Sequence, residues 1–190
     1  EELLNTIREK RSVVLDAIVN IIEGKEITVL EPINKMILPK VSVITTIFKA
    51  GEFIKGYLEA FVQQTYKNTE LIIIDANSPD NEEEVVKTYQ KEHKNIVYKR
   101  MDDRIPGAEA NNIGLSMATG EFIVICLIDD RMAKDHLETL AKHLYLDKDV
   151  DLVYADCQQT TKPNETVEQN SSNGRLYEHS RMEFSRENLI

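Results

Sequence analysis

The chain has 190 residues, of which 42% are hydrophobic and 29% are charged, a balance that suits one globular domain with its own core plus a small appendage. Its formal net charge of −10 disfavours nucleic acid and anionic membranes as partners, because an acidic surface repels phosphate groups. No apolar run is long enough for a transmembrane segment, and the start of the chain is unlike a signal peptide.

Residues 1–40 have the pattern of a helix followed by a connector. Apolar residues recur at helical spacing between positions 3 and 22, and Gly24 is a suitable stop. Pro32 and Pro39 then mark a connector. Since the charges of the stripe at 3–22 are mixed, we expect it to form a packing face or a homo-oligomer contact rather than a membrane anchor.

From residue 41 onwards, segments with strand and helix patterns alternate. The strands are expected at 41–48, 71–74, 96–101, 122–128 and 150–155, and the helices at 52–66, 81–94, 106–119 and 134–146. The strongest strands are apolar throughout, which indicates a mainly parallel sheet with helices on both faces. Pro106 and Gly120 have the positions of caps for the third helix. The polar stretch 158–175 is expected to be a loop or a mobile hairpin.

Acidic residues follow three of the predicted strands, and the pair Asp129 and Asp130 is the most informative. Ligands of open α/β sheets lie beyond the carboxyl ends of the strands. Adjacent carboxylates after a buried strand are costly unless a cation meets them, and a divalent ion with oxygen ligands is suited to that role. Such an ion would let an acidic protein bind a diphosphate. Alternatively, one of the two side chains caps the following helix, and both interpretations remain open from position alone.

Other kinds of phosphate or metal site are disfavoured by the sequence. Neither a G-x-x-x-x-G-K-[ST] loop nor a G-x-G-x-x-G loop is present, and Gly107 and Gly114 are weak signals by themselves. The chain has two cysteines, Cys126 and Cys157, with no zinc-like spacing. We expect both thiols to be buried and reduced, which fits the cytoplasm.

Four stretches of the chain follow one another in a distinctive order. They are VSVITTIF at 41–48, QQTYKNTELIIID at 63–75, NNIG at 111–114, and GEFI at 120–123 with LIDDR at 127–131. In this order they resemble the first strand, the Q-T-Y-x-N-x-E passage, the A-R-N-x-G helix and the D-x-D-D metal motif of family 2 inverting glycosyltransferases. The resemblance covers about residues 41–161 and implies an α/β GT-A fold, a Rossmann-like parallel sheet flanked by helices.

The resemblance implies a binding site for the nucleotide of a nucleotide-sugar donor. The end of the first strand would line the base and ribose, and Asp75 would accept a hydrogen bond from the imide N–H of uracil, so the expected donor is a UDP-sugar. Arg104 and Arg131 would reach the ribose or the phosphates. The nucleotide-binding residues implied in this way are Thr45, Thr46, Phe48, Asp75, Arg104 and Asn112.

The resemblance also implies a metal site, with one departure from the family pattern. Asp129 matches the last Asp of the D-x-D and would hold Mn²⁺ or Mg²⁺ against the diphosphate, with Asp130 beside it. Leu127 stands where the family has the first Asp of this motif.

The general base of the family is an Asp or Glu further along the chain, and it has no recognisable counterpart in residues 156–190. The catalytic residue is therefore not identified. We expect it to lie beyond Ile190, so that the GT-A domain at 41–190 is incomplete at its C-terminal end.

The expected function is that of a cytoplasmic, metal-assisted glycosyltransferase of polysaccharide biosynthesis. It would move a sugar from a nucleoside-diphosphate donor to a hydroxyl of a glycan or another acceptor, with inversion. One alternative is a catalytically impaired nucleotide-sugar-binding module that lacks the general base. Another is an unrelated α/β phosphate enzyme or a receiver-type domain, although the acidic pair of receiver domains follows the first strand and not the fourth.

Overall fold

The computed structural model describes residues 39–147, 149–160, 162–169 and 176–177. All of them belong to one compact unit of the chain, residues 38–190. The helix predicted within residues 1–24 and its apolar stripe lie outside the described residues, so the division of the chain at residue 40 stays a prediction. None of the described helices is both long enough and apolar enough to cross a membrane.

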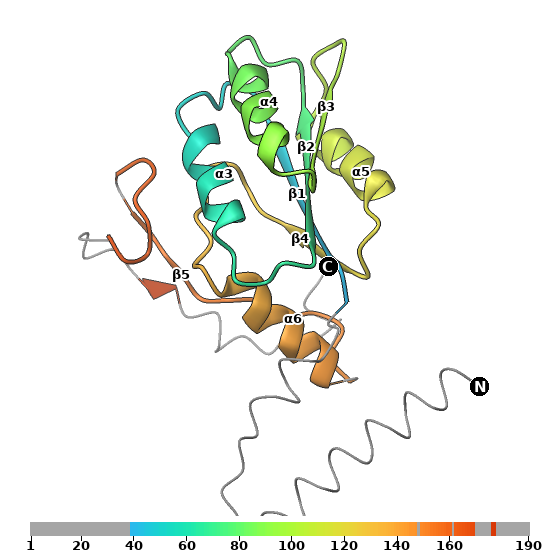
Figure 1. The fold of residues 1–190 in the computed structure, drawn as a ribbon, viewed down its shortest axis with the longest axis vertical. Helices are drawn as coiled ribbons and strands as arrows, with labels where there is room; N and C mark the ends of the chain where they lie inside the picture. Colours follow the sequence, from blue (N-terminus) through green and yellow to red (C-terminus); the bar gives the residue numbers. More distant parts are fainter. Residues whose placement is uncertain (1–38, 148, 161, 170–175, 178–190) are drawn as a thin grey trace, which may run out of the picture. The chain divides into compact units, whose positions relative to one another are not determined.

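Four parallel strands form the centre of the domain, in the order β3-β2-β1-β4 (Figure 1). β1 (Val41–Ile47) pairs over its whole length with β2 (Thr69–Asp75). β3 (Ile96–Arg100) pairs with the far side of β2, and β4 (Phe122–Ile125) pairs with the far side of β1. Because all four strands run in the same direction, the residues that follow them gather at one end of the sheet, here called the carboxyl end.

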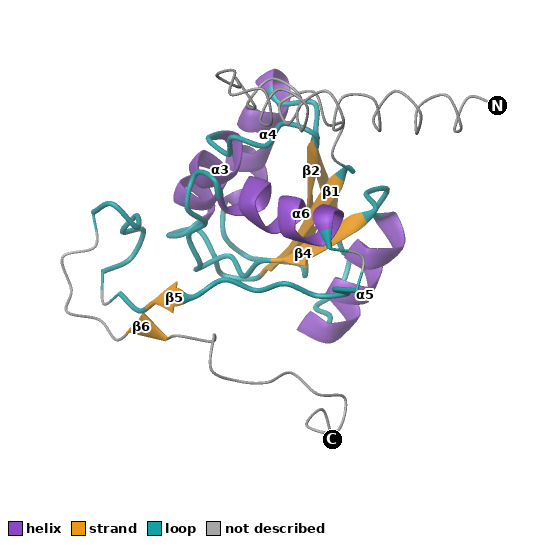
Figure 2. Ribbon diagram, turned by 90° about the horizontal axis from the view of Figure 1, so that it is seen from below, coloured by secondary structure: helices purple, strands orange, loops and turns teal. Residues whose placement is uncertain are grey.

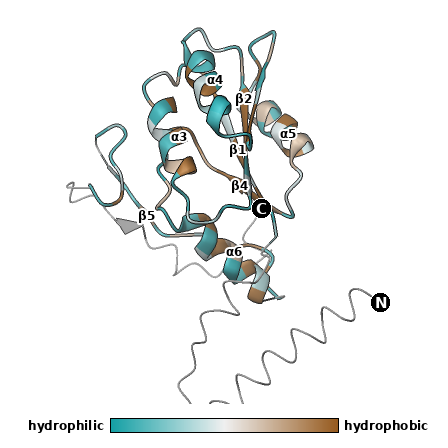
Figure 3. Ribbon diagram, viewed as in Figure 1, coloured by the Kyte–Doolittle hydropathy of each residue, from teal (hydrophilic) through white to brown (hydrophobic). Residues whose placement is uncertain are grey.

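Helices cover both faces of this sheet, as the apolar strands predict (Figures 1 and 2). α3 (Ile54–Val62), α4 (Glu82–Glu92) and α6 (His136–Leu146) share one hydrophobic cluster with alternate residues of the strands. The other set of alternate residues packs against α5 (Gly107–Met117) in a second cluster. Hydrophobic residues concentrate in the strands, whereas α4 is largely hydrophilic (Figure 3). The predicted α/β architecture is therefore confirmed.

The prediction of a strand at 150–155 is wrong. Residues 152–156 have no regular structure, and a cavity of about 340 Å³ is lined both by β4 and by residues 151–155. A strand requires a hydrogen-bonded neighbour, and the register of β4 in the described chain includes β1 alone. Instead, β5 (Cys157–Gln158) pairs antiparallel with β6 (Leu176–Tyr177), so the predicted loop at 158–175 begins within β5, and residues 159–175 connect two short strands.

The prediction that Gly120 caps a helix is also wrong. α5 ends at Met117, and its C-cap residue, Ala118, is already extended. A Cβ at position 120 would lie 2.7 Å from both the carbonyl oxygen of Lys40 and the backbone nitrogen of Ser42. Glycine is therefore required here because two backbone segments approach each other closely.

Gly114→Ala is expected to lower the free energy of unfolding by about 2 kcal/mol through overpacking. The new Cβ would lie 2.5 Å from Cγ2 of Ile44, a fully buried residue, and better helix propensity of about 1 kcal/mol would offset only part of the cost. Gly107 in the same helix is the matched control, because a Cβ there would have no atom within 4 Å. Urea unfolding should show Gly107→Ala at least as stable as the wild type, and equal stability of Gly114→Ala would contradict the tight packing of α5.

Glu70 connects β2 with β1 and with the turn that precedes β4. Its carboxylate accepts hydrogen bonds from Lys40 Nζ at 2.7 Å, Ser42 Oγ at 2.5 Å and the backbone N–H of Thr119 at 2.8 Å. Burial alone would raise the pKa of Glu70, but these donors and the Thr119 hydroxyl together lower the pKa from 4.5 to about 2. The ionised carboxylate therefore stabilises the folded state.

Lowering the pH from about 6 to about 2.5 should remove about 2 kcal/mol of the free energy of unfolding through Glu70, after allowance for the partly exposed Lys40. Because the pKa is lowered on folding, this contribution is complete above pH 4.5 and is lost as the pH falls through about 2. The Glu70→Gln variant lacks the titrating group. Its urea midpoint should lie well below that of the wild type at pH 6 and approach it at pH 2.5, and a constant difference would contradict this assignment.

Candidate functional site

The predicted nucleotide-binding residues of β1 and β2 lie at the carboxyl end of the sheet. Thr45 and Thr46 belong to the last part of β1, buried and half-buried respectively, and Phe48 directly follows the strand. Asp75 is the last residue of β2 and pairs in register with Arg100, the last residue of β3. This is the end of the sheet where the topology of the fold places ligands.

Asp75 is completely buried and holds three hydrogen-bond donors. It accepts from the backbone N–H of Ser78 at 2.6 Å, from Arg100 Nη1 at 2.7 Å and from the hydroxyl of Tyr98. Burial, followed by the Asp75 carboxylate, raises the pKa of Tyr98, so the phenol stays protonated and continues to donate. Tyr98 and Arg100 could not be identified from the sequence, because only the register between β2 and β3 brings them to Asp75.

Phe48 and Arg104 are brought into direct contact. The guanidinium carbon of Arg104 lies 3.6 Å from the centre of the Phe48 ring, and Lys49 Nζ lies 5.7 Å from the same centre. Both distances are within the range of cation–π attraction. Two residues predicted separately for the nucleotide site thus form one aromatic and cationic surface. Asn112 is an exposed residue of α5.

Asp129 and Asp130 lie on the loop that joins β4 to α6, where a turn is closed by a 3.1 Å hydrogen bond from the Asp130 N–H to the Leu127 carbonyl. α6 begins at His136, and its N-cap residue is Asp135. Neither member of the pair therefore occupies the capping position, so the capping alternative is wrong. Both carboxylates remain available for a ligand.

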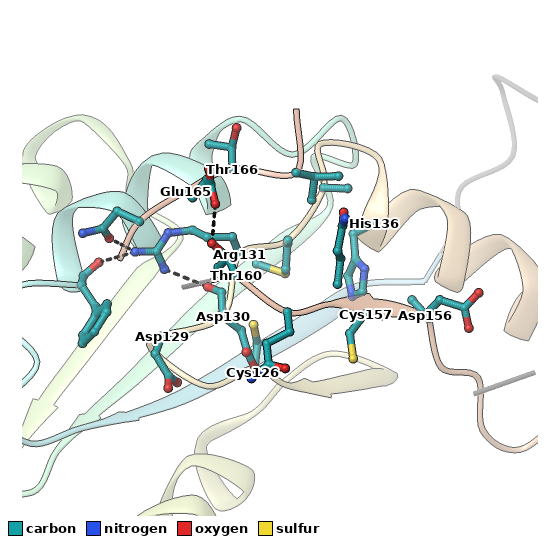
Figure 4. A pocket seen from close by; sticks show the side chains of 18 of the residues that line it. Cys126, Asp129, Asp130, Arg131, His136, Asp156, Cys157, Thr160, Glu165 and Thr166 are labelled. Carbon is teal, nitrogen blue, oxygen red and sulfur yellow. Dashed lines mark hydrogen bonds between the residues drawn. The ribbon is translucent and has the colours of Figure 1, made fainter. Parts of the chain in front are cut away.

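The pair lines a cavity of about 960 Å³, together with residues of α6 and of the segments 155–160 and 162–167 (Figure 4). Burial, and then the negative charge of Asp129, raises the pKa of Asp130. In Figure 4 the side chain of Arg131 extends away from both carboxylates, and it does not lie between them. Two adjacent carboxylates with this electrostatic strain fit a divalent cation.

The described residues supply no group of three His, Cys, Asp or Glu side chains that would hold a metal by themselves. An ion at Asp129 and Asp130 would take its other ligands from phosphate oxygens and water, which is a common arrangement for Mg²⁺. The cavity as described is lined by none of the predicted nucleotide residues, which are Thr45, Thr46, Phe48, Asp75, Arg104 and Asn112. The structure thus groups the metal pair in one place and the Phe48–Arg104 surface in another.

The general base is the part of the predicted site that the structure does not test. The described residues end at Tyr177, so residues 178–190 and anything beyond Ile190 lie outside them. The expectation that the base follows Ile190 therefore stays a prediction, and no catalytic residue is assigned within the described part of the chain.

The two cysteines differ in their surroundings. Cys126, just after β4, is buried, as predicted, and its carbonyl accepts a 3.2 Å hydrogen bond from the Tyr57 hydroxyl. Burial raises the pKa of the Cys126 thiol to about 11. The prediction that Cys157 is buried is wrong, because it is exposed on β5. The strand expected before it does not form, so Cys157 is not carried into the sheet.

Comparison with known proteins gives consistent matches. The family model described as Glycosyl transferase family 2 matches residues 42–189. Glycosyltransferase GlyG of Streptococcus pneumoniae is 31% identical over 113 residues, which are 60% of this chain and 37% of that protein. The GalNAc(5)-diNAcBac-PP-undecaprenol beta-1,3-glucosyltransferase of Campylobacter jejuni is 33% identical over 104 residues, covering 54% of this chain and 34% of that protein. The chain spans about a third of the length of these relatives.

Solved structures have the same arrangement of strands and helices as this chain. The mannosyltransferase PcManGT from Pyrobaculum calidifontis, in complex with GDP-Man and Mn²⁺, matches with a TM-score of 0.54 at 27% identity, over 57% of this chain and 33% of that one. TarS 1–349 of S. aureus in complex with UDP shares the fold, with a TM-score of 0.53 at 24% identity over 56% of this chain and 32% of that one. The GT-A fold is thereby confirmed, and the chain belongs to glycosyl transferase family 2.

Proposed function

We propose that the chain forms the donor-binding part of a glycosyltransferase that moves a sugar from a nucleoside-diphosphate donor to an acceptor hydroxyl with inversion. The main observation behind this proposal is that Asp129 and Asp130 line a cavity after β4. Neither residue caps α6, whose N-cap residue is Asp135. Membership of family 2 supports the reaction class. The GDP-Man and Mn²⁺ in the structure of PcManGT support a nucleotide-sugar donor and a divalent metal.

In this proposal Asp129 and Asp130 hold Mn²⁺ or Mg²⁺. When bound, such an ion offsets the negative charge that develops on a departing diphosphate. The two side chains act as ionised ligands. The negative charge of Asp129 adds to the cost of ionising Asp130, and a bound cation would offset that cost. An acidic protein thereby obtains a phosphate-binding site without a basic cluster.

The nucleotide in this proposal is UDP. The Phe48 ring with Arg104 offers a surface for the base or for a phosphate. Asp75 has three donors already, and a carboxylate accepts about four hydrogen bonds, so one acceptor position remains for the imide N–H of uracil once the groups that cover this fully buried side chain move aside. The donors Tyr98 and Arg100 fix the carboxylate in place for that contact.

The proposal is tested by calorimetric titration of the 190-residue chain with UDP, GDP and dTDP, each with Mn²⁺ and with EDTA. We expect UDP to bind best of the three, and far more tightly with Mn²⁺ than with EDTA. Equal binding in EDTA, or no binding of any of the three, would overturn the donor-binding assignment.

A second candidate, a nucleotide-sugar-binding module without turnover, is favoured by one observation. Leu127 stands in the place of the first Asp of the metal motif, and its side chain is 55% exposed. An assay of UDP release from UDP-sugars, with and without added glycan acceptors, separates the two candidates. Binding that is metal-dependent but accompanied by no release of UDP would favour the module.

A further inference from the structure

Arg131 directly follows the acidic pair, but its guanidinium is engaged by backbone carbonyl groups. It donates to the carbonyl oxygens of Asp130 at 2.8 Å, Ile128 at 3.2 Å and Phe53 at 3.1 Å. The first two belong to its own loop, whereas Phe53 is the N-cap residue of α3. Arg131 therefore ties the loop of the acidic pair to the start of α3.

Asn164 joins the same place from a distant part of the chain. Its backbone has a left-handed φ of 61°, a conformation that asparagine tolerates better than most residues. Its side-chain oxygen accepts a hydrogen bond from Arg131 Nη2, and its amide donates to the Glu52 carbonyl at 2.9 Å. One side chain thus fastens the segment 162–169 both to Arg131 and to the turn before α3.

Gly56 makes room for this contact. A Cβ at position 56, in the first turn of α3, would lie 2.6 Å from Asn164 Oδ1 and 2.8 Å from Arg131 Nη2. No side chain larger than hydrogen fits there without displacing one of the two polar groups. Gly56, Arg131 and Asn164, which are far apart in the sequence, therefore pack tightly against one another.

We propose that Arg131 and Asn164 form a clasp that positions residues 162–167 as a wall of the cavity that Asp129 and Asp130 also line, and that donor binding requires this wall. The inference rests on the proposed function, because the wall borders the site proposed for the metal and the diphosphate. In this proposal Arg131 is a positioning residue, whereas the sequence led us to expect a contact with the ribose or the phosphates.

The experiment compares Asn164→Ala and Gly56→Ala with the wild type and with Glu168→Gln. Glu168 is exposed on the same segment and does not line the cavity, so it controls for unspecific changes of this segment. Calorimetry with UDP measures the dissociation constant with Mn²⁺ and with EDTA, and hydrogen exchange measures protection of residues 162–169. We expect both clasp variants to lose about tenfold in affinity with Mn²⁺ only, which is the size of effect seen when supporting residues of a metal site are removed, and to lose protection in this segment.

A double-mutant cycle completes the test. If the clasp is one unit, Asn164→Ala causes no further loss of affinity or protection in the Arg131→Gln background. Additive losses, or wild-type affinity of Asn164→Ala with Mn²⁺, would overturn the proposal. Should the wild type itself fail to bind UDP, the proposed function fails. The clasp is then judged by hydrogen exchange alone, where unchanged protection in Asn164→Ala and Gly56→Ala would refute it.

Discussion

Asp129→Ala is expected to weaken binding of UDP in the presence of Mn²⁺ on the order of 100-fold, at the upper end of losses seen for residues that support a metal site. The physical reason is that the described residues offer only the pair Asp129 and Asp130 as adjacent anionic ligands after β4, with no third side chain in position to replace one of them. Removing one carboxylate halves the protein's share of the coordination. Binding in EDTA should be unchanged, since no metal is then involved.

The control for this prediction is Glu121→Gln, which changes the net charge by the same amount just before β4, at the opposite end of the strand from the acidic pair. It should bind UDP with Mn²⁺ as the wild type does. Asp129→Asn keeps the shape of the side chain but loses its charge, so it should fall between the wild type and Asp129→Ala. Calorimetry gives all of these dissociation constants, and a loss of equal size in Mn²⁺ and EDTA would show that the carboxylate supports the fold and not a cation.

The strands of the sheet could be predicted where local apolar runs are strong, and not where pairing is non-local. The prediction covers the whole of β1 and the central residues 71–74 of β2, because both strands are buried on two faces and contain continuous apolar segments. The strand predicted at 122–128 ends earlier, at Ile125, since the last ladder bond runs from the Cys126 N–H to the Ile44 carbonyl. For 150–155, β-favouring residues alone were not enough, because no described neighbour pairs with them.

In the candidate site, too, local sequence patterns predict some residues but not their long-range contacts. The acidic pair could be found from its position after an apolar strand, without knowledge of its surroundings. The partners of Asp75 could not, because Tyr98 and Arg100 reach it only through the register of β3 on β2. From the sequence, Arg131 is interpreted as a ligand-binding residue because it adjoins the acidic pair. Its hydrogen-bond partner Asn164 lies 33 positions further along the chain, so the sequence does not indicate this contact. Local motifs therefore indicate where the candidate site lies, and long-range contacts determine which partners its neighbouring residues have.

Asp75→Asn is expected to lower the free energy of unfolding by about 4 kcal/mol, the typical cost of leaving a buried ion pair with one partner. The carboxylate is fully buried and its ion pair with Arg100 is 2.7 Å long, so the guanidinium, itself 33% exposed, would lose the charge that compensates its partial burial. An asparagine would also direct an amide donor at one of the existing donors, Arg100, Tyr98 or Ser78.

The matched control is Asp80→Asn, in the same loop, where the carboxylate is exposed and accepts a long 3.4 Å hydrogen bond from the Gly51 N–H. Its stability should remain within about 0.5 kcal/mol of the wild type. Urea unfolding at pH 7 measures both variants. If Asp75→Asn were as stable as Asp80→Asn, the carboxylate would not be needed to hold Arg100 and Tyr98, and its charge would have to serve the ligand instead. A large loss of stability would mean that Asp75, the residue proposed to contact the base, also holds the ends of β2 and β3 together.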